Sequence, residues 1–248
     1  MSFDSKEVFD KFIKSLINLG SGSQGVVYYD SKNQKTYKIF LQYFDNDLDY
    51  YVKYKIDEVL RFKDFVNDTI IFPQDVITVC GEVVGYVMRY VAGFPLYTID
   101  PLKLDLDLFG KGIEKTEFDF RFISNHGIKS YDISYNVMYN NGVFNVVDTD
   151  DYSFSSLDAY LLTNINNGNL CYEITRFLVD GYFDGFVLNN KILKEMYIGN
   201  EATALEFLQA FRYYLSECMG KDIKRLSAAN GCLNRKKTVI CYERSIKR

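Results

Sequence analysis

The chain has 248 residues, of which 48% are hydrophobic and 25% charged, and its net charge is −4. This composition is typical of a globular protein and excludes a disordered chain. It gives no strong nucleic-acid signal, and no apolar run reaches the roughly 18 residues of a membrane-spanning helix. The chain start does not resemble a signal peptide, and the five cysteines are widely spaced. We therefore expect a cytoplasmic protein with reduced thiols and no membrane partner.

The first part of the chain shows regular apolar spacing in four segments. These segments predict, in order, a helix, two strands and a second helix, at 5–17, 17–29, 36–42 and 47–65. A β-hairpin is predicted at 75–80 and 83–91, around Cys80-Gly81-Glu82. The character of the sequence changes after Gly93-Phe94-Pro95, which predicts one lobe over 1–92 and another over 93–248.

The second part of the chain is predicted to be mostly helical. Residues 103–125 have a partly helical pattern, and Asn140-Asn141-Gly142 predicts the turn of a hairpin over 137–147. Further helices are predicted at 172–181, 188–196 and 202–218. The resulting fold class is α+β, with an antiparallel sheet and one main helix in the first lobe.

A glycine-rich stretch precedes the second predicted strand. Gly20, Gly22 and Gly25 have the spacing G-x-G-x-x-G, and Lys38 follows 13 residues later. Such a loop lets backbone N–H groups approach phosphates, because glycine has no Cβ. Alone, the pattern also fits an ordinary hairpin or a dinucleotide fold, but in the latter a helix should follow directly. Here the β-prone Val26-Val-Tyr-Tyr follows, which favours a hairpin over nucleotide phosphates.

Several polar residues downstream have the types and the order that phosphoryl transfer from ATP requires. Glu58 lies on the predicted helix 47–65, where an acid could hold Lys38. Asp132 and Asn136 precede the second hairpin, and Asp148 and Asp150 follow it. Structural roles remain open for all of them: Lys38 as a solvated strand lysine, Glu58 as a surface glutamate, and Asp132 and Asn136 as turn residues.

Over residues 15–155 the sequence resembles the protein-kinase-like superfamily. Gly20-Ser-Gly-Ser-Gln-Gly-Val-Val-Tyr resembles its glycine-rich loop, and Tyr37-Lys-Ile its strand lysine. Tyr86-Val-Met-Arg-Tyr-Val-Ala-Gly is similar to the strand that enters the hinge, and His126-Gly-Ile-Lys-Ser-Tyr-Asp-Ile to the approach to the catalytic loop. The resemblance implies a bilobal kinase-like fold, with ATP and Mg²⁺ held between the lobes.

The resemblance also implies residue roles. Asp132 becomes the catalytic base. Lys38, which pairs with Glu58, becomes a catalytic residue that binds phosphate. Met88 becomes the gatekeeper, with Arg89 to Val91 beside the adenine. The metal ligands are Asn136 and Asp148, and Asp150 either replaces Asp148 or binds a second ion. The implied ATP-binding residues are Gly20, Ser21, Gly22, Ser23, Gln24, Gly25, Val27, Lys38, Glu58, Met88, Arg89, Tyr90 and Val91.

The chain departs from the family pattern in its second part. Asp132 and Asn136 are one residue closer than in the usual catalytic loop, and Tyr131 replaces the usual arginine. Thr149-Asp150 follows Asp148 in place of Phe-Gly, as in small-molecule and atypical kinases, and no Ala-Pro-Glu is present. These departures indicate a reduced or atypical member without a phosphorylated activation loop.

We therefore expect an ATP- and Mg²⁺-dependent phosphotransferase that acts on protein Ser/Thr hydroxyls. Two alternatives remain: a small-molecule kinase, favoured by Asp148-Thr-Asp150, and a pseudokinase or nucleotide-binding interaction module, favoured by the shortened loop. The tail 221–248 has nine Lys/Arg against two Asp/Glu. It is expected to be a solvated basic surface or to contact an acidic partner.

Overall fold

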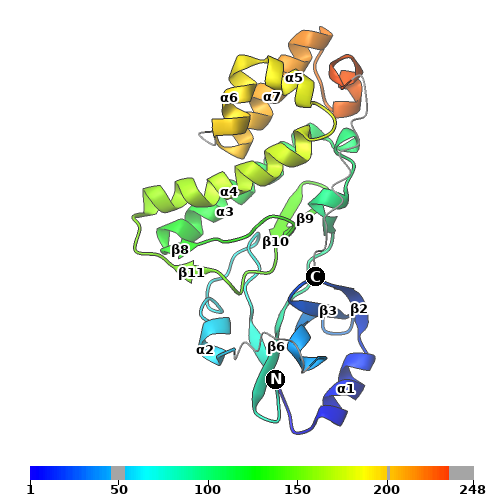
Figure 1. Cartoon of the computed structure of the whole chain (residues 1–248), viewed down its shortest axis with the longest axis vertical. Helices are drawn as coiled ribbons and strands as arrows, with labels where there is room; N and C mark the ends of the chain where they lie inside the picture. The colour runs from blue at the N-terminus through cyan, green and yellow to red at the C-terminus, as the bar shows by residue number, and fades with distance from the viewer. Residues whose placement is uncertain (46–53, 200–201, 235–248) are drawn as a thin grey trace. The chain divides into compact units, whose positions relative to one another are not determined.

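The computed structural model describes residues 1–45, 54–199 and 202–234. The protein is α+β, with a mixed sheet and several helices (Figure 1). It divides into two compact units: Met1–Gly93 with Asn145–Tyr152, and Phe94–Phe144 with Ser153–Arg248. The first break falls one residue from the predicted boundary. Segment Asn145–Tyr152, expected in the second lobe, groups instead with the first unit.

The first unit contains a six-stranded sheet in the order β1-β5-β6-β4-β3-β2. The expected wholly antiparallel sheet is wrong in one place, because β1 pairs in parallel with β5. At two residues, β1 is too short to show a periodic pattern in the sequence. The strands are β1 Ser2–Phe3, β2 Ile17–Ser21, β3 Gly25–Asp30, β4 Lys35–Phe40, β5 Asp75–Val79 and β6 Glu82–Arg89.

The hairpin of β5 and β6 confirms the prediction at 75–80 and 83–91. Its two turn residues, Cys80 and Gly81, have φ values of 51° and 86°. Positive φ at both central residues matches the right-handed twist of paired strands.

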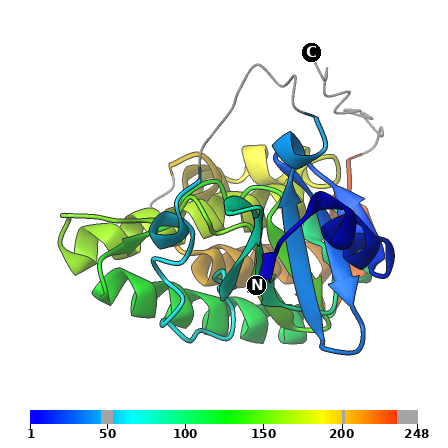
Figure 2. The ribbon, with the colours of Figure 1, turned by 90° about the horizontal axis from the view of Figure 1, so that it is seen from below.

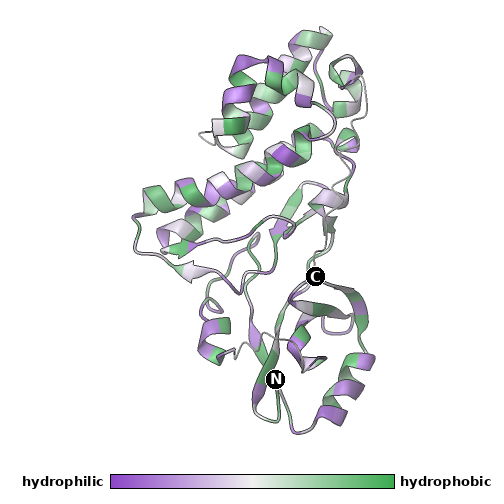
Figure 3. Ribbon diagram, viewed as in Figure 1, coloured by the Kyte–Doolittle hydropathy of each residue, from purple (hydrophilic) through white to green (hydrophobic). Residues whose placement is uncertain are grey.

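Helix α1, Lys6–Lys14, confirms the first predicted helix. Ser5 caps it by accepting a hydrogen bond from the Val8 N–H at 3.3 Å. Phe9 and Ile13 are buried in a core cluster with residues of β4, β5 and β6. Hydrophilic and hydrophobic residues alternate in colour along this helix in Figure 3, as expected for a helix with one buried face.

The second predicted helix, 47–65, is present only in part over its described residues. Residues 46–53 lie outside the described residues, and α2 covers only Ile56–Val59. After it, the N–H groups of Lys63 and Phe65 bond the carbonyls of Leu60 and Phe62, three residues back. The apolar spacing that predicted an α-helix therefore belongs to successive i→i+3 turns.

Segment Asn145–Tyr152 is fixed to the first unit by hydrogen bonds to the chain before β5. The Ile71 N–H donates to the Val146 carbonyl at 2.9 Å, and the Val146 N–H donates to the Thr69 carbonyl at 2.8 Å. The Thr149 hydroxyl donates to the Ile71 carbonyl at 2.8 Å and is buried. These bonds determine where the residues on either side of Thr149 lie.

The second unit is mostly helical. Its two longest helices, α3 and α4, lie side by side (Figures 1 and 2). Helix α4 begins at Ala159, where Asp158 accepts a hydrogen bond from the Leu161 N–H at 2.9 Å. It thus begins 13 residues, more than three turns, before the predicted start at 172. The helices are α3 Leu106–Asn125, α4 Ala159–Val179, α5 Asp184–Asn189, α6 Lys191–Gly199 and α7 Ala204–Met219.

Short strands complete the second unit. The β9–β10 hairpin confirms the prediction over 137–147: its turn residues Asn141 and Gly142 have φ values of 45° and 91°. One small sheet has the order β10-β9-β7, and β11 pairs with β8. The strands are β7 Phe94–Pro95, β8 Ile128–Lys129, β9 Val137–Asn140, β10 Val143–Val146 and β11 Ser153–Phe154. The 3₁₀ helices of the chain are Leu41–Tyr43, Leu96–Thr98, Pro101–Lys103 and Leu226–Cys232.

The described helices were also compared with the requirements of a membrane span. Within residues 1–45, 54–199 and 202–234, none has both the length and the apolar character to cross a bilayer. Most of the basic tail, from residue 235 onward, lies outside the described residues.

Candidate functional site

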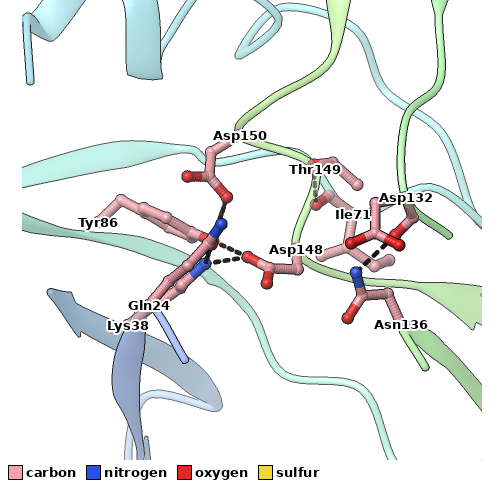
Figure 4. A network of polar contacts seen from close by, with 9 residues as sticks. All are labelled: Gln24, Lys38, Ile71, Tyr86, Asp132, Asn136, Asp148, Thr149 and Asp150. Carbon is pink, nitrogen blue, oxygen red and sulfur yellow. Dashed lines mark hydrogen bonds and ion pairs between the residues drawn. The ribbon is translucent and has the colours of Figure 1, made fainter. Parts of the chain in front are cut away.

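A buried lysine lies at the centre of the polar cluster in the first unit (Figure 4). Lys38, on β4, is only 4% exposed. Its Nζ donates to Gln24 Oε1 at 3.0 Å and forms a close ion pair with Asp148. It also contacts Asp150 Oδ1 at 3.4 Å. We call these four residues, together with Tyr86, the lysine cluster.

The strand pairing explains why Lys38 is buried. It lies between Val27 of β3 and Tyr86 of β6, its paired residues on either side. Side chains alternate along a strand, so Lys38 is on the same face as Phe40, which belongs to a core cluster. An ammonium taken out of water must be paired, and here the pairing groups come from Asp148 and Asp150.

Tyr86 is a site residue that the sequence interpretation missed. It is fully buried, and its hydroxyl lies 3.2 Å from Asp148 Oδ1 and 3.0 Å from Asp150 Oδ1. A buried tyrosine usually finds a hydrogen-bond partner. The sequence signal that could have identified Tyr86 is a tyrosine within an otherwise apolar strand next to the strand of Lys38.

The two carboxylates have opposite electrostatic behaviour. Burial raises the pKa of the Asp148 carboxyl, but the Lys38 charge, with hydrogen bonds from Lys38 and Tyr86, outweighs burial and holds that pKa below its ordinary value. The pKa of Asp150 is raised, first by burial and then by the negative charge of Asp148, against the attraction of Lys38. Asp148 is thus the ionised partner of Lys38, and Asp150 is the carboxyl that more readily takes up a proton.

Asp148 has a constrained backbone. Its φ is 61°, in the left-handed region that non-glycine residues seldom adopt. The hydrogen bond of the next residue, Thr149, to Ile71 holds the chain on one side of it. Backbone conformations of this kind persist where surrounding structure enforces them, and they are common at functional sites.

The glycine-rich loop joins β2 to β3. The Gly22 N–H donates to the Gly25 carbonyl at 2.9 Å. A Cβ at Gly25 would lie 2.6 Å from the Ile39 carbonyl oxygen, so this position requires glycine. A Cβ at Gly20 or Gly22 would meet nothing within 4 Å. Ser21 and Ser23 are exposed, so the loop has an open side on which a ligand could approach.

Glu58 is not a partner of Lys38 in this structure, which corrects the expected ion pair. Its carboxylate pairs instead with Lys55 at 3.0 Å, and its side chain is 51% exposed. Because α2 is a single turn, it does not present an acid toward β4 as a long helix would.

The predicted adenine-contacting segment has other partners within the first unit. Met88 is buried in the core, and Arg89 bonds the Asp68 carbonyl. The Tyr90 N–H donates to the Gln34 carbonyl at 3.2 Å, and the Tyr90 ring lies 4.1 Å from that of Tyr29. Val91 packs against the core cluster that contains Tyr86.

Asp132 and Asn136 lie in the second unit. The Asn136 Nδ2 donates to the Asp132 carbonyl at 2.7 Å, so this amide closes the loop (Figure 4). Asp132 is exposed and has a φ of 30°. The loop begins at Ser130, whose N–H donates to the buried Asn166 Oδ1 of α4 at 2.9 Å. The turn-residue alternative is therefore compatible with the structure.

The possible metal ligands were compared with what Mg²⁺ requires. In the described ranges there is no cluster of three or more His, Cys, Asp or Glu side chains that could hold a metal ion. Mg²⁺ that arrives with a nucleotide needs only one or two carboxylates in addition to phosphates. Asp148 and Asp150 meet that lower requirement, since both contact the same ammonium and the same hydroxyl.

Comparisons with known proteins add no assignment. No family model matches the chain, and the comparison with curated proteins found no match.

Proposed function

We propose that the protein is an ATP- and Mg²⁺-dependent phosphotransferase of the protein-kinase-like fold that phosphorylates a hydroxyl group. The observation that carries the proposal is the lysine cluster. A buried lysine, two carboxylates and a residue of a glycine-rich loop meet within one unit, although Lys38 and Asp148 are 110 residues apart in sequence.

The cluster supports the proposal because of its chemistry. Lys38 supplies a positive charge beside a loop whose glycines leave room for phosphates. Phosphoryl transfer depends on fixed charges more than on covalent participation by the protein. Mg²⁺, when bound through Asp148 and Asp150, would neutralise negative charge on the phosphates.

The proposed reaction converts ATP and an alcohol into ADP, a phosphate ester and a proton. A bond forms between the hydroxyl oxygen and the γ-phosphorus, and the bond from that phosphorus to the β,γ-bridging oxygen breaks. The hydroxyl proton passes to the Asp132 carboxylate and then to water, and ADP leaves. Asp132 takes this role from its sequence position, with Asn136 as the residue that closes its loop.

Nucleotide binding is tested by thermal unfolding with and without millimolar Mg-ATP. A ligand that binds only the folded state raises the midpoint, so we expect an upward shift. Gly22→Val should abolish it, because a side chain there extends into the open side of the loop, where a Cβ meets no protein atom within 4 Å. Gly199→Val is the matched control, since Gly199 is equally open at the end of α6. No shift in the unmodified chain would overturn the nucleotide site.

Transfer is tested separately with γ-labelled ATP and a panel of hydroxyl acceptors that includes a generic protein substrate and neutral polyols. Asp132→Asn should lower incorporation by about 10²–10⁴-fold, the range for removal of a general base, while its ATP-induced shift stays unchanged. Equal label incorporation with the unmodified chain and with Asp132→Asn would show that Asp132 is not the base.

A second candidate function is a nucleotide-independent interaction module. The observation that favours it is that Lys38 already contacts Gln24, Asp148 and Asp150, as expected of a purely structural ion pair. This candidate predicts no Mg-ATP shift and no label incorporation, so the same two measurements separate it from the first.

A further inference from the structure

The second unit contains a surface hollow beside Asp132. Its volume is about 440 Å³, within the roughly 300–1,000 Å³ typical of small-molecule sites. It lies between the loop that carries Asp132 and the middle of α4. Its polar and open positions are Asp132, Ser134, Asn164, Gly168, Asn169 and Tyr172.

The loop side of the hollow is anchored to α4. The Tyr135 N–H donates to Glu173 Oε1 at 3.4 Å, and Ser134 also hydrogen-bonds the Glu173 side chain. Asn169 donates to the Ser130 hydroxyl at 3.4 Å. The loop is thus attached to the helix at both of its ends, which holds the lining in place.

The helix side of the hollow includes an interior glycine. Glycine in the middle of a helix is destabilising relative to alanine, and here it is not required by close packing, because a Cβ at Gly168 would meet nothing within 4 Å. The space above Gly168 belongs to the hollow. A glycine at this point keeps room for a ligand against the helix backbone.

The chemistry of the lining defines the kind of ligand. Among the eight described residues that line the hollow, only Asp132 is charged, and no lysine or arginine is present. The site therefore does not suit an acceptor recognised through a phosphate or carboxylate. Two amides and a hydroxyl supply hydrogen bonds. Tyr172, a residue 46% exposed, supplies an aromatic ring, and the Arg176 guanidinium lies 5.2 Å from the centre of that ring.

We propose that this hollow binds the phosphoryl acceptor, and that the acceptor is a small uncharged ring bearing several hydroxyls, such as a monosaccharide or a cyclitol. The amides of Asn164 and Asn169 bond ring hydroxyls, and Tyr172 packs against the C–H face of the ring. The identification as acceptor depends on the proposed function, since Asp132 would take the proton of the hydroxyl that is phosphorylated. The binding of the ring to the hollow does not depend on the proposed function.

Binding is therefore measured without nucleotide, by ligand-observed NMR on the full chain. The probes are D-glucose, D-ribose and myo-inositol, with glucose 6-phosphate and a serine-containing peptide as comparisons. We expect at least one neutral probe to bind with a dissociation constant of about 1 mM or tighter. Charged glucose 6-phosphate should bind more weakly than glucose.

Two variants locate the site. Tyr172→Ala and Gly168→Leu should each weaken probe binding by about tenfold or more. Tyr160→Ala is the matched control, because Tyr160 is an exposed tyrosine of α4 outside the hollow. Gly168→Leu should keep or raise the thermal midpoint, since leucine favours a helix over glycine and the position is open. A loss of binding in that variant therefore cannot be attributed to unfolding.

The inference is overturned if no neutral probe binds the unmodified chain, if Gly168→Leu leaves binding intact, or if the peptide alone binds. These outcomes are distinguishable from failure of the proposed function. A missing Mg-ATP shift removes the nucleotide site, whereas missing probe binding with an intact Mg-ATP shift removes only the acceptor class.

Discussion

The lysine cluster and the Asp132 loop carry candidate chemistry in different ways. In the cluster, charged groups are buried and contact one another: Lys38 is 4% exposed, and Tyr86 is fully buried. In the loop, Asp132 is exposed, and the order comes from backbone and amide hydrogen bonds around it. Substitutions in the cluster should therefore change stability and ligand binding together. Substitutions at Asp132 should change reactivity or acceptor binding while leaving stability unchanged.

The largest expected effect is that of Lys38→Met. It keeps the length of the side chain but leaves Asp148 and Asp150 beside each other without a cation. Removing one partner of a buried ion pair costs about 3–5 kcal/mol, so urea unfolding should show a loss near that size. Lys35→Met, at an exposed position of the same strand, should stay within about 0.5 kcal/mol. Equal, small losses for both would mean that the cluster does not stabilise the fold.

A smaller effect on the free energy of unfolding is expected when Asp148 or Asp150 is replaced by asparagine, at pH 7 in EDTA. The two substitutions should act in opposite directions. The fold lowers the pKa of Asp148 and so favours its ionised form. Asp148→Asn should then lower the free energy of unfolding, by about 1–3 kcal/mol. The fold raises the pKa of Asp150 and so disfavours its ionised form. Asp150→Asn should leave stability unchanged or raise it.

The pH dependence follows from the same shifts. The contribution of Asp148 is fully present above its ordinary pKa and is lost as pH falls through its lower folded value. For Asp150, stability declines as pH rises from its ordinary pKa through its raised folded value. Asp150→Asn should therefore reduce the decline in stability as pH rises through that range. Urea midpoints measured from acidic to neutral pH test this, and an unchanged profile would contradict the assignment of the raised pKa to Asp150.

Tyr86→Phe should give a moderate loss. It removes one buried hydroxyl that contacts both carboxylates and leaves no unpaired donor behind, so about 1–2 kcal/mol is expected. Tyr37→Phe, at a similarly buried tyrosine of β4, is the comparison and should cost less. If Tyr37→Phe cost as much, the hydroxyl of Tyr86 would have no special role in placing the carboxylates.

The smallest stability effect is expected for Asp132→Asn. The Asp132 side chain is exposed. The group that closes the loop is its backbone carbonyl, which asparagine retains. The free energy of unfolding should change by about 0.5 kcal/mol or less. A loss as large as that of Lys38→Met would show that the two regions do not differ in the way described.

Sequence patterns were most informative where turn chemistry and periodicity agree. Both predicted hairpins are present, because Cys80-Gly81 and Asn141-Gly142 adopt the positive φ values that such turns need. The second helix was overestimated, because apolar residues spaced by three also suit successive turns. The start of α4 was missed because several asparagines, poor helix formers, weaken its pattern.

The polar partners in the candidate site were only partly foreseeable. Lys38, Asp148 and Asp150 were identified by order and residue type, and the structure brings them together. Their mutual contact, and that of Tyr86 with them, depends on strand register and on the hydrogen bonds of Thr149, which no local pattern reveals. Glu58 was assigned to Lys38 because its helix was expected to be long, and the single turn of α2 gives it Lys55 instead.

The return of Asn145–Tyr152 to the first unit has a consequence for folding during synthesis. After Gly93 the chain forms part of the second unit. Segment Asn145–Tyr152 then belongs to the first unit again and carries the Asp148 carboxylate that pairs with Lys38. Domains tend to fold from the N-terminal end as the chain emerges from the ribosome, but this one cannot neutralise its buried lysine until residue 152 has emerged. A fragment that ends at Gly93 should therefore be more prone to aggregation than the full chain.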